Sequence, residues 1–194
     1  LGKEVSWCKP DKFIADKIRG MADYDVIASD DRYLITNTEN RKANKYLAEL
    51  KNLGLLNAHS YEKFIPDMYI DTCRDQRVEL LNGLLDTDGD IDKNGAICYN
   101  TTSVKLARGV QTLCWSLGYK CSLRERRSFL YGERKRNSFR LVIVADNPRE
   151  CFTLPRKFDR VRMDRRNKPL TVMSVTPTNR RVERQCISVS HEKA

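Results

Sequence analysis

Two carboxylates at the end of an apolar helical stretch are the side chains of this sequence best placed to do chemistry. Apolar residues recur at helical spacing over Asp75–Asp86, and Asp88 follows just before Gly89. The C-terminal end of a helix dipole disfavours negative charge, so carboxylates gathered there need cations, and Mg²⁺ is a natural one. Gly83, in mid-helix, costs about 1 kcal/mol relative to Ala. That cost is tolerable if the glycine lets a partner helix approach closely.

Basic residues concentrate in two windows of the chain. The net charge is +10 over 194 residues. Residues 120–140 hold eight basic and two acidic residues, and residues 156–168 hold seven and two, so these windows carry the whole excess. A solvated basic face is one interpretation, but two such windows favour a polyanionic partner, most simply nucleic acid.

The first basic window is predicted to form a long hairpin over Lys120–Val144, with a polar tip near Gly132. Residues two apart on a strand share a face, so alternating arginines could line one side of a sheet. A two-stranded ribbon fits the major groove of DNA. A charged, solvent-facing hairpin is the alternative, and which arginines read bases stays open. The DNA-binding candidates are Arg124, Arg126, Arg134, Arg136 and Arg140.

A second acidic pattern follows the helix. Asp90, Asp92, Asn94 and Gly95 match the start of an EF-hand calcium loop, but the twelfth position is Thr101 in place of a bidentate Glu. A polar turn is therefore the preferred interpretation, and a calcium-binding protein is the weakest of three functional hypotheses.

These residues require a mixed α+β frame to position them. Helices are expected over Asp11–Ala22, over Lys42–Leu53 and from Thr102 or Ser103 to about Leu117. A hairpin is expected over Tyr24–Thr36 and a strand over Ala96–Tyr99. The remaining segments are an extended connection over Tyr61–Tyr69 and a short helix or turn over Pro148–Leu154. The first part of the chain has the order helix, hairpin, helix. The same order occurs later in the chain, where an opening helix and first strands precede it. This pattern indicates an internal repeat.

The helix and its surroundings together resemble the LAGLIDADG homing endonucleases, in the form carried by inteins. Residues 76–90 resemble the family signature, and four other segments fall as in the family's second repeat or in the lysine-bearing segments that flank it: Glu62–Asp67, Asn100–Ser103, Leu113–Gly118 and Leu154–Lys157. The resemblance implies αββαββα repeats related by a pseudo-two-fold axis. It also implies saddle-shaped antiparallel sheets over double-stranded DNA and Mg²⁺-dependent phosphodiester hydrolysis.

The resemblance also implies roles for individual residues. It makes Asp88 the metal-binding acid and leaves Asp86 to support the helix end. Lys63 and Lys157 are the lysines expected near the scissile phosphate, where they could stabilise developing charge or orient the attacking water. Gly83 and Gly89 are expected at the interface between two motif helices.

The resemblance further divides the chain into three parts. Residues 1–74 are the remainder of a first repeat without its motif helix, 75–163 the second repeat, and 164–194 part of the all-β splicing (Hint) domain of an intein. The last part rests on strands predicted at Thr171–Val175 and Gln185–Val189, for which an ordinary closing hairpin is the alternative. With the first acidic helix missing, by truncation or by loss, a one-acid site should cleave poorly or not at all.

Composition narrows the remaining functional classes. Every apolar run is too short for a membrane span, and no signal peptide is visible. Seven cysteines without a Cys-x-x-Cys pair indicate thiols in a reducing, cytoplasmic compartment. The leading hypothesis is an intein-borne homing endonuclease whose partners are double-stranded DNA and the intein's parent polypeptide, monomeric when both repeats are intact. The second is a catalytically degenerate DNA-binding module, such as a maturase-like or regulatory relative.

Overall fold

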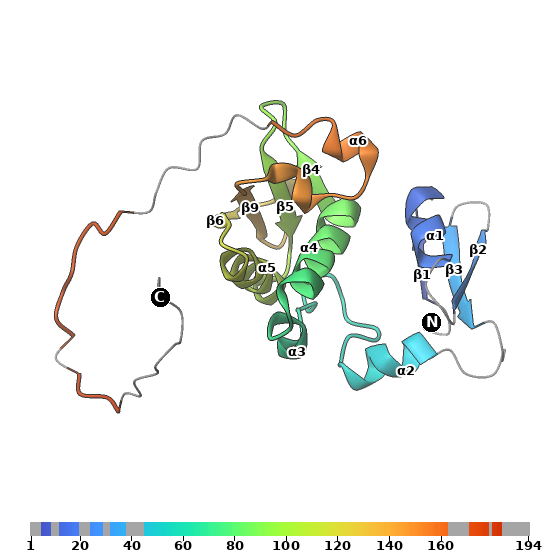
Figure 1. Ribbon diagram of the computed structural model, residues 1–194, viewed down its shortest axis with the longest axis horizontal. Helices are drawn as coiled ribbons and strands as arrows, with labels where there is room; N and C mark the ends of the chain where they lie inside the picture. The colour runs from blue at the N-terminus through green and yellow to red at the C-terminus, as the bar shows by residue number, and fades with distance from the viewer. Residues whose placement is uncertain are drawn as a thin grey trace, which may run out of the picture.

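A four-stranded antiparallel sheet with two helices on one face organises the second half of the chain (Figure 1). The computed structural model describes residues 5–8, 12–19, 24–28, 32–37, 45–162, 171–178 and 180–183. The strand order is β4-β5-β9-β6, and helices α4 and α5 pack against the sheet. The bounds are α4 Arg74–Asp88, β4 Gly89–Ile91, β5 Ile97–Thr101, α5 Val104–Ser116, β6 Lys120–Arg126 and β9 Ser138–Val144.

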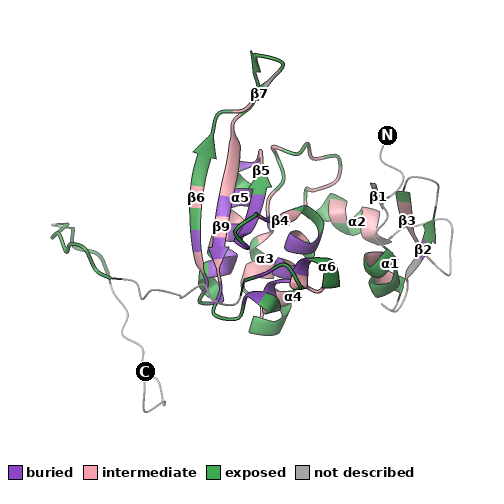
Figure 2. Cartoon of the chain, turned by 90° about the horizontal axis from the view of Figure 1, so that it is seen from above, coloured by how far each residue is buried: buried purple, intermediate pink, exposed green. Residues whose placement is uncertain are grey.

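Strand alternation gives the sheet one apolar face and one polar face. Tyr99, Leu141 and Leu123 lie opposite one another on β5, β9 and β6, on the side where α4 and α5 contribute the rest of the core. The neighbouring residues in each strand must point to the opposite side, called here the outer face. Figure 2 shows the buried residues concentrated where the helices meet the sheet. The sequence prediction of an α+β fold is therefore confirmed.

Local signals determine where both covering helices begin and end. Ser103 is the N-cap of α5, and its hydroxyl oxygen accepts a hydrogen bond from the Leu106 amide at 3.1 Å. Gly118, with φ +80°, follows the end of α5. Helix α4 extends through Asp88, two residues beyond its predicted end, and Gly89 is its C-cap. A Cβ at Gly89 would lie 2.4 Å from the carbonyl oxygen of Leu85, so only glycine fits there.

The N-terminal part has a smaller sheet with the same connectivity. Its strands pair in the order β1-β3-β2, which corresponds to β5-β9-β6: a strand, a helix, then an antiparallel hairpin whose second strand pairs with the first. This topology confirms the repeated order of elements and adds strand β1, which the sequence analysis missed. The bounds are β1 Val5–Cys8, α1 Lys12–Arg19, β2 Tyr24–Ala28, β3 Arg32–Asn37 and α2 Lys45–Asn52.

Several short elements were not predicted from the sequence. Helix α3 (Asp67–Ile70) interrupts the expected extended connection, and β4 forms where only a turn was expected. Helix α6 (Pro155–Phe158) was also not predicted, whereas η1 (Pro148–Cys151), just before it, lies where a short helix or turn was predicted. The tip of the long hairpin forms its own two-stranded sheet from β7 (Phe129–Leu130) and β8 (Glu133–Arg134).

The strand predicted at Thr171–Val175 is wrong. Residues 171–178 have no helix or strand, and Val172, Met173 and Val175 are exposed. A strand requires a partner for its backbone hydrogen bonds, and no described strand pairs with this segment. The strand predicted at Gln185–Val189 lies outside the described residues. Within the described part of the chain, no helix combines the length and apolar character needed to cross a membrane.

Candidate functional site

Asp88 occupies the last position of α4, directly before the chain enters the sheet through β4. The side chain is exposed, and no described residue forms a hydrogen bond or ion pair with its carboxylate. Its charge reaches the buried ring of Tyr99 on β5, where burial first and the Asp88 carboxylate second raise the pKa of the tyrosine. The residue is thus an unpaired negative charge at the negative end of a helix dipole, which favours a bound cation.

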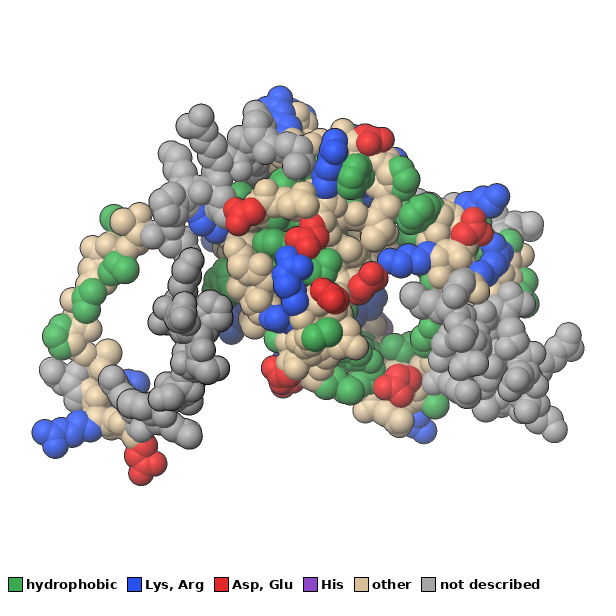
Figure 3. Space-filling view, viewed as in Figure 1, with side chains coloured by type: hydrophobic (Ala, Val, Ile, Leu, Met, Phe, Trp, Pro, Cys, Tyr) green, Lys and Arg blue, Asp and Glu red, His purple; other side chains and the backbone are tan. Residues whose placement is uncertain are grey.

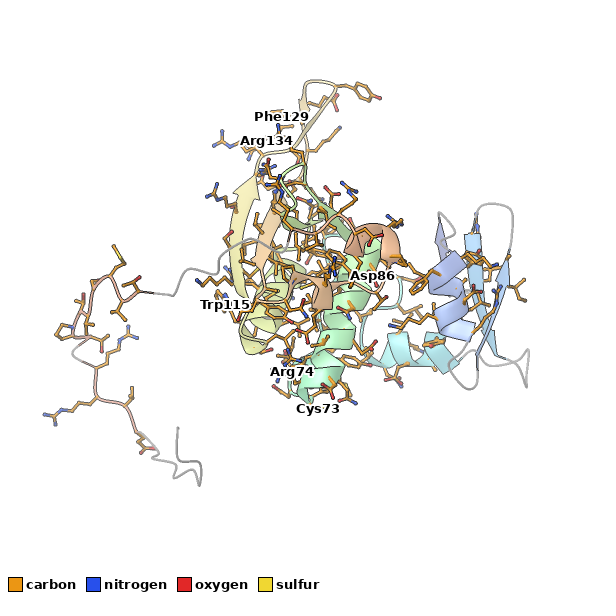
Figure 4. The ribbon with its side chains drawn as sticks, turned by 45° about the horizontal axis from the view of Figure 1, so that its top comes forward. Cys73, Arg74, Asp86, Trp115, Phe129 and Arg134 are labelled. Carbon is orange, nitrogen blue, oxygen red and sulfur yellow. The ribbon has the colours of Figure 1, made fainter. Side chains whose placement is uncertain are left out.

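Asp86, two residues earlier, is buried and fully used by the fold. Its carboxylate accepts hydrogen bonds from the Thr153 amide at 3.1 and 3.2 Å, from the Thr153 hydroxyl at 2.5 Å and from the Leu154 amide at 3.3 Å. These bonds fix the backbone that leads into α6. Figure 4 shows Asp86 toward the C-terminal end of α4, with Arg74 and Cys73 at the other end. This supporting role is the one the sequence analysis expected for Asp86.

Lys157 lies beneath the same helix end and is only 5% exposed. Its ammonium donates to the carbonyl oxygens of Leu85 at 2.6 Å, Asp86 at 2.7 Å and Gly89 at 2.8 Å. The Leu85 carbonyl also accepts from the Gly89 amide, and the ammonium supplies a donor to the other carbonyls at the helix C-terminus, where further helix amides are lacking. Burial, followed by the charge of Arg156, lowers the pKa of Lys157, against the opposing effect of nearby aspartates. The geometry gives Lys157 a structural function at the helix end, and its catalytic function stays a prediction.

Lys63 lies on the segment between α2 and α3 (residues 53–66), which is called the linker below. Its side chain is exposed. Its carbonyl accepts a hydrogen bond of 2.6 Å from the Ser103 hydroxyl, so the linker is attached to the N-terminus of α5. No described residue forms a hydrogen bond or ion pair with its ammonium. The side chain is therefore free to meet an anion, and its predicted role near a scissile phosphate stays a prediction.

Gly83 lies on an exposed stretch of α4 that faces α1. A Cβ at Gly83 would meet nothing within 4 Å, and a cleft between the two helices is lined by Phe13, Ile18 and Thr87 among others. Lys17 bridges this cleft to Glu79 at 3.1 Å. In the view of Figure 3, acidic side chains gather over the region of α4. Helix α1 thus leaves room at Gly83, and the close helix approach predicted there stays a prediction.

Three of the five candidate arginines lie on the outer face of the sheet. Arg140 on β9 stands between Asn100 on β5 and Arg124 on β6 in one cross-strand row, and Arg126 lies two residues further along β6. Arg124 and Arg126 are exposed and pair with no described residue. The row offers guanidinium and amide groups to one side of the sheet.

Arg140 is held in place, unlike its two neighbours. Its guanidinium lies 3.0 Å from the Cys98 sulfur and 3.6 Å from a carboxylate oxygen of Asp92. The other carboxylate oxygen of Asp92 accepts hydrogen bonds from the amides of Asn94 at 2.8 Å and Ala96 at 2.9 Å. Asp92 thus holds the β4–β5 turn and Arg140 together. The segment that resembled a calcium loop is a β-hairpin in which the Asp92 carboxylate is used by the turn itself, so the calcium pattern loses one of its carboxylate ligands.

The other two arginines lie away from the cross-strand row. The β6–β9 ladder ends at the pair Arg126–Ser138, and Arg134 and Arg136 come from the segment beyond it. Both border a groove with Tyr61 and Thr102 next to the start of α5. The Arg136 guanidinium lies 3.9 Å from the centroid of the Tyr61 ring. Their predicted DNA contacts are untested, but they cannot share one regular strand face with Arg124.

Asp88 fits a magnesium ion as one of its ligands. Mg²⁺ is usually held by one or two carboxylates together with waters and substrate phosphates. The described residues contain no group of three or more His, Cys, Asp or Glu side chains that could hold a metal ion. Asp88 would therefore supply one carboxylate ligand, and the remaining ligands would be waters, substrate phosphates or another acidic side chain.

Comparison with known families identifies the segment that contains these features. Residues 75–153 match the family model of the LAGLIDADG-like domain. This segment is a LAGLIDADG-like domain. The match runs from the start of α4 to Thr153, the residue that Asp86 binds.

Individual relatives of the LAGLIDADG-like domain were also found. The chain is 36% identical over 110 residues to a replicative DNA helicase, DnaB, of Mycobacterium intracellulare; the match covers 57% of this chain and 18% of the helicase. Among solved structures, variants of the homing endonuclease I-DmoI give a TM-score of 0.42 at 13% identity, covering 74% of this chain and 73% of theirs. I-DmoI G20S in complex with its target DNA and Mg gives 0.41 at 14%, covering 73% and 72%.

Two polar contacts between α4 and η1, one buried and one exposed, were missed by the sequence analysis. Asn82 is buried on α4, and its amide nitrogen, when oriented toward the facing carbonyls, lies 2.8 Å from the oxygen of Glu150 and 3.1 Å from that of Cys151. Arg74 forms two hydrogen bonds with the Glu150 carboxylate, at 3.0 and 3.1 Å. With Asp86, these residues attach one face of α4 to the segment before α6. The four-residue spacing of Asn82 and Asp86 on a buried helix face was the available signal.

Proposed function

We propose that this domain belongs to an intein-borne homing endonuclease that cleaves double-stranded DNA at a specific site with Mg²⁺. The observation that carries the proposal is the carboxylate of Asp88, which is unpaired and exposed. It lies at the end of α4, the signature helix of a LAGLIDADG-like domain. The neighbouring Asp86 is buried and fully bonded. Asp88 is thus the residue of this pair with free coordination capacity.

The outer face of the sheet is the proposed docking surface for duplex DNA. Arg124 and Arg126 are free to bind phosphates, and such contacts supply sequence-independent, salt-sensitive affinity. Arg140 is held by Asp92 beside the exposed amide of Asn100. Arg suits the acceptors of guanine and Asn those of adenine, so this row is suited to reading bases in the major groove.

In this proposal the chain's own residues hold and orient the reacting groups. Asp88 holds one oxygen ligand position for Mg²⁺, which when bound would polarise the scissile phosphate. Lys63 carries a free ammonium on the linker and would stabilise the negative charge that develops on the phosphate. Lys157 keeps the carbonyls at the end of α4 in place, which fixes the position from which Asp88 projects.

The chemistry needs a second carboxylate to complete a two-acid site. The proposal places it on another acidic helix that packs on the exposed part of α4 around Gly83, where a Cβ would meet nothing within 4 Å. The small side chain would let the two helix backbones approach closely. In its two-repeat form the protein would act as a monomer.

The intein setting is proposed from the helicase relative. The match covers only 18% of the replicative DNA helicase, at 36% identity to this chain. An intein inserted in such a host would produce a match of this kind. The splicing (Hint) part would then include residues 164–194, in a reducing, cytoplasmic compartment. Expression of the parent gene followed by mass spectrometry tests this part of the proposal. A ligated host protein lacking this chain supports it, and a single uncleaved polypeptide contradicts it.

The nuclease proposal is tested on the full-length parent. The parent is incubated with Mg²⁺ and a duplex carrying the uninterrupted host-gene site, and the products are resolved on a denaturing gel. Two defined ends are expected, and Asp88→Asn should abolish them while leaving DNA affinity within about twofold, since Asp88 has no role in the core. Binding without cleavage by the unmodified parent would overturn the nuclease proposal.

The second candidate is a DNA-binding module without catalysis. It is favoured by one observation: the described residues contain no group of three or more His, Cys, Asp or Glu side chains that could hold a metal ion. This candidate predicts salt-sensitive duplex binding that survives Asp88→Asn and weakens when Arg124, Arg126 and Arg140 are changed together. A loss of three phosphate or base contacts should also reduce the salt dependence of binding, which distinguishes it from misfolding.

A further inference from the structure

The long hairpin is divided by a break in its hydrogen-bonded ladder. Pairing between β6 and β9 ends at Arg126–Ser138 and resumes at Phe129–Arg134 in the β7–β8 pair. Two residues on one side and three on the other separate the ladders. We call residues 127–137 the distal arm. Figures 2 and 4 show it projecting beyond the end of the four-stranded sheet, with Phe129 and Arg134 on it.

The distal arm contacts the linker between the two repeats through a stack of three side chains. Arg136 lies over the ring of Tyr61, with 3.9 Å between its guanidinium carbon and the ring centroid. The other neighbour of Tyr61 is His59, whose ring is stacked at 5.3 Å with an interplanar angle of 8°. A guanidinium over an aromatic face is attracted by the ring quadrupole, so the contact fixes both distance and orientation.

The linker is a firm platform for this stack. Glu62 closes a turn by accepting from the His59 amide at 3.0 Å and by donating its own amide to the His59 carbonyl at 2.9 Å. Two hydrogen bonds attach the turn to the residues before α5: the Thr102 hydroxyl donates to the Ser60 hydroxyl at 3.2 Å, and the Ser103 hydroxyl donates to the Lys63 carbonyl at 2.6 Å. Tyr61 is thereby fixed relative to the core of the domain.

Other hydrogen bonds join the base of the arm to itself and to the ends of the two strands that lead into it. Asn137 donates to Glu125 at 2.5 Å, the Ser128 hydroxyl donates to Ser138 at 3.0 Å, and the Lys135 amide donates to the Ser128 carbonyl. The bonds to Glu125 on β6 and Ser138 on β9 hold only the base of the arm, at the ends of the strands that it continues. The contact of Arg136 with Tyr61 joins the arm to a segment outside the hairpin, so it restricts the direction in which the arm leaves the sheet.

We propose that Tyr61 is a positioning residue for DNA binding, which acts through Arg136 to set the direction in which the distal arm leaves the sheet. The proposal rests on duplex DNA docking at the outer face. The arm carries the exposed basic residues Arg127 and Arg134 and the exposed rings of Phe129 and Tyr131, the last 97% exposed. A correctly directed arm extends the protein's contact along the duplex beyond the sheet.

Binding to duplexes of two lengths tests the proposal on the complete chain. Affinity is measured by fluorescence anisotropy for a duplex of roughly 21 base pairs, about two turns, and for one of roughly 10 base pairs, about one turn. On the long duplex, Tyr61→Ala should weaken binding about 2- to 5-fold, which is the range expected for one exposed cation–π contact. On the short duplex, which the sheet alone can cover, the variant should match the unmodified protein.

Three further variants separate positioning from simple loss of a side chain. Tyr61→Phe keeps the aromatic face and should restore full affinity. Arg136→Ala should weaken binding at least as much as Tyr61→Ala, and the double variant should lose no more than Arg136→Ala alone. Equal loss on both duplexes, or additive losses in the double variant, would overturn the proposal.

Amide hydrogen exchange gives a measurement that does not depend on DNA. Tyr61→Ala should speed exchange within residues 127–137 and leave β9 residues 139–144 unchanged. Tyr131→Ala, at the exposed tip, is the matched control and should change neither. If the unmodified chain binds duplex but Tyr61→Ala binds equally well, the positioning role alone is wrong. If the unmodified chain binds neither duplex, the proposed function fails and the positioning role fails with it.

Discussion

The ammonium of Lys157 offers the sharpest test of how the signature helix is held. Lys157→Met keeps the aliphatic stem and removes the charged donor. The Leu85 carbonyl retains a bond from the Gly89 amide, but the carbonyls of Asp86 and Gly89 lose their ammonium partner. Each buried carbonyl left without a donor costs about 1–3 kcal/mol. Loss of a cation near the helix C-terminus adds about 0.5 kcal/mol.

The variant no longer has the desolvation cost of a buried ammonium, which offsets part of this loss. We expect a net decrease of about 3 kcal/mol in the free energy of unfolding. Urea denaturation followed by far-ultraviolet circular dichroism measures it by linear extrapolation. Lys105→Met is a matched control, because Lys105 is exposed on α5 and should change stability by less than about 0.5 kcal/mol.

A decrease below about 1 kcal/mol for Lys157→Met would refute the structural reasoning. If a Lys157→Met variant that kept its stability also failed to cleave DNA in the parent protein, Lys157 would have the direct catalytic role that the family resemblance implies. The structural role would then be rejected. The two roles are thus separated by one substitution and two measurements.

Three further predictions follow from other contacts. Gly89→Ala should destabilise the domain by about 1–3 kcal/mol in the same urea assay, because its Cβ would lie 2.4 Å from the Leu85 carbonyl oxygen; an unchanged midpoint would contradict this. The bidentate bond from Arg74 lowers the pKa of Glu150 below its ordinary value of 4.5, so its contribution to stability is complete above that pH and disappears as the pH falls through the lowered pKa. The stability difference between the unmodified protein and Glu150→Gln should therefore be present at neutral pH and close in acid, and a difference that persists at the lowest pH would contradict the assignment. In the native protein, a thiol reagent should modify the exposed Cys73 rapidly and leave unmodified, until unfolding, the buried thiols of Cys98, Cys114, Cys121 and Cys151.

Features set by neighbours along the chain were predictable from the sequence. The apolar spacing of residues 75–86, followed by Gly89, correctly indicated helix α4 and its stop. For α5, the cap predicted at Thr102 or Ser103 is Ser103, and the stop near Gly118 was also correct. The alternation of β6 and β9 placed Arg124 and Arg140 on one face. Capping, helical spacing and strand alternation act within a few residues, so one sequence carries the information.

Features set by contacts between distant segments were decided by the tertiary structure alone. The sequence gives no reason for Lys157 to lie beneath a helix end 72 residues earlier, or for Asp86 to bind Thr153, 67 residues later. Periodicity also could not show that the ladder breaks after Arg126, which moves Arg136 from the sheet to the linker. A charged side chain has many available partners in an extended chain, and only packing selects among them.

The strand predicted at Thr171–Val175 was wrong for the same reason, because a strand depends on contacts with another segment. Its β-branched and apolar residues suit a strand, but a strand is stable only beside a partner, and no described strand lies beside this one. By itself, the sequence determined the signature helix, its carboxylates and the basic hairpin, because these depend on local spacing. The fold decided which carboxylate stays free, which lysine is buried and which arginines share a face, because those outcomes depend on what each side chain meets across the structure.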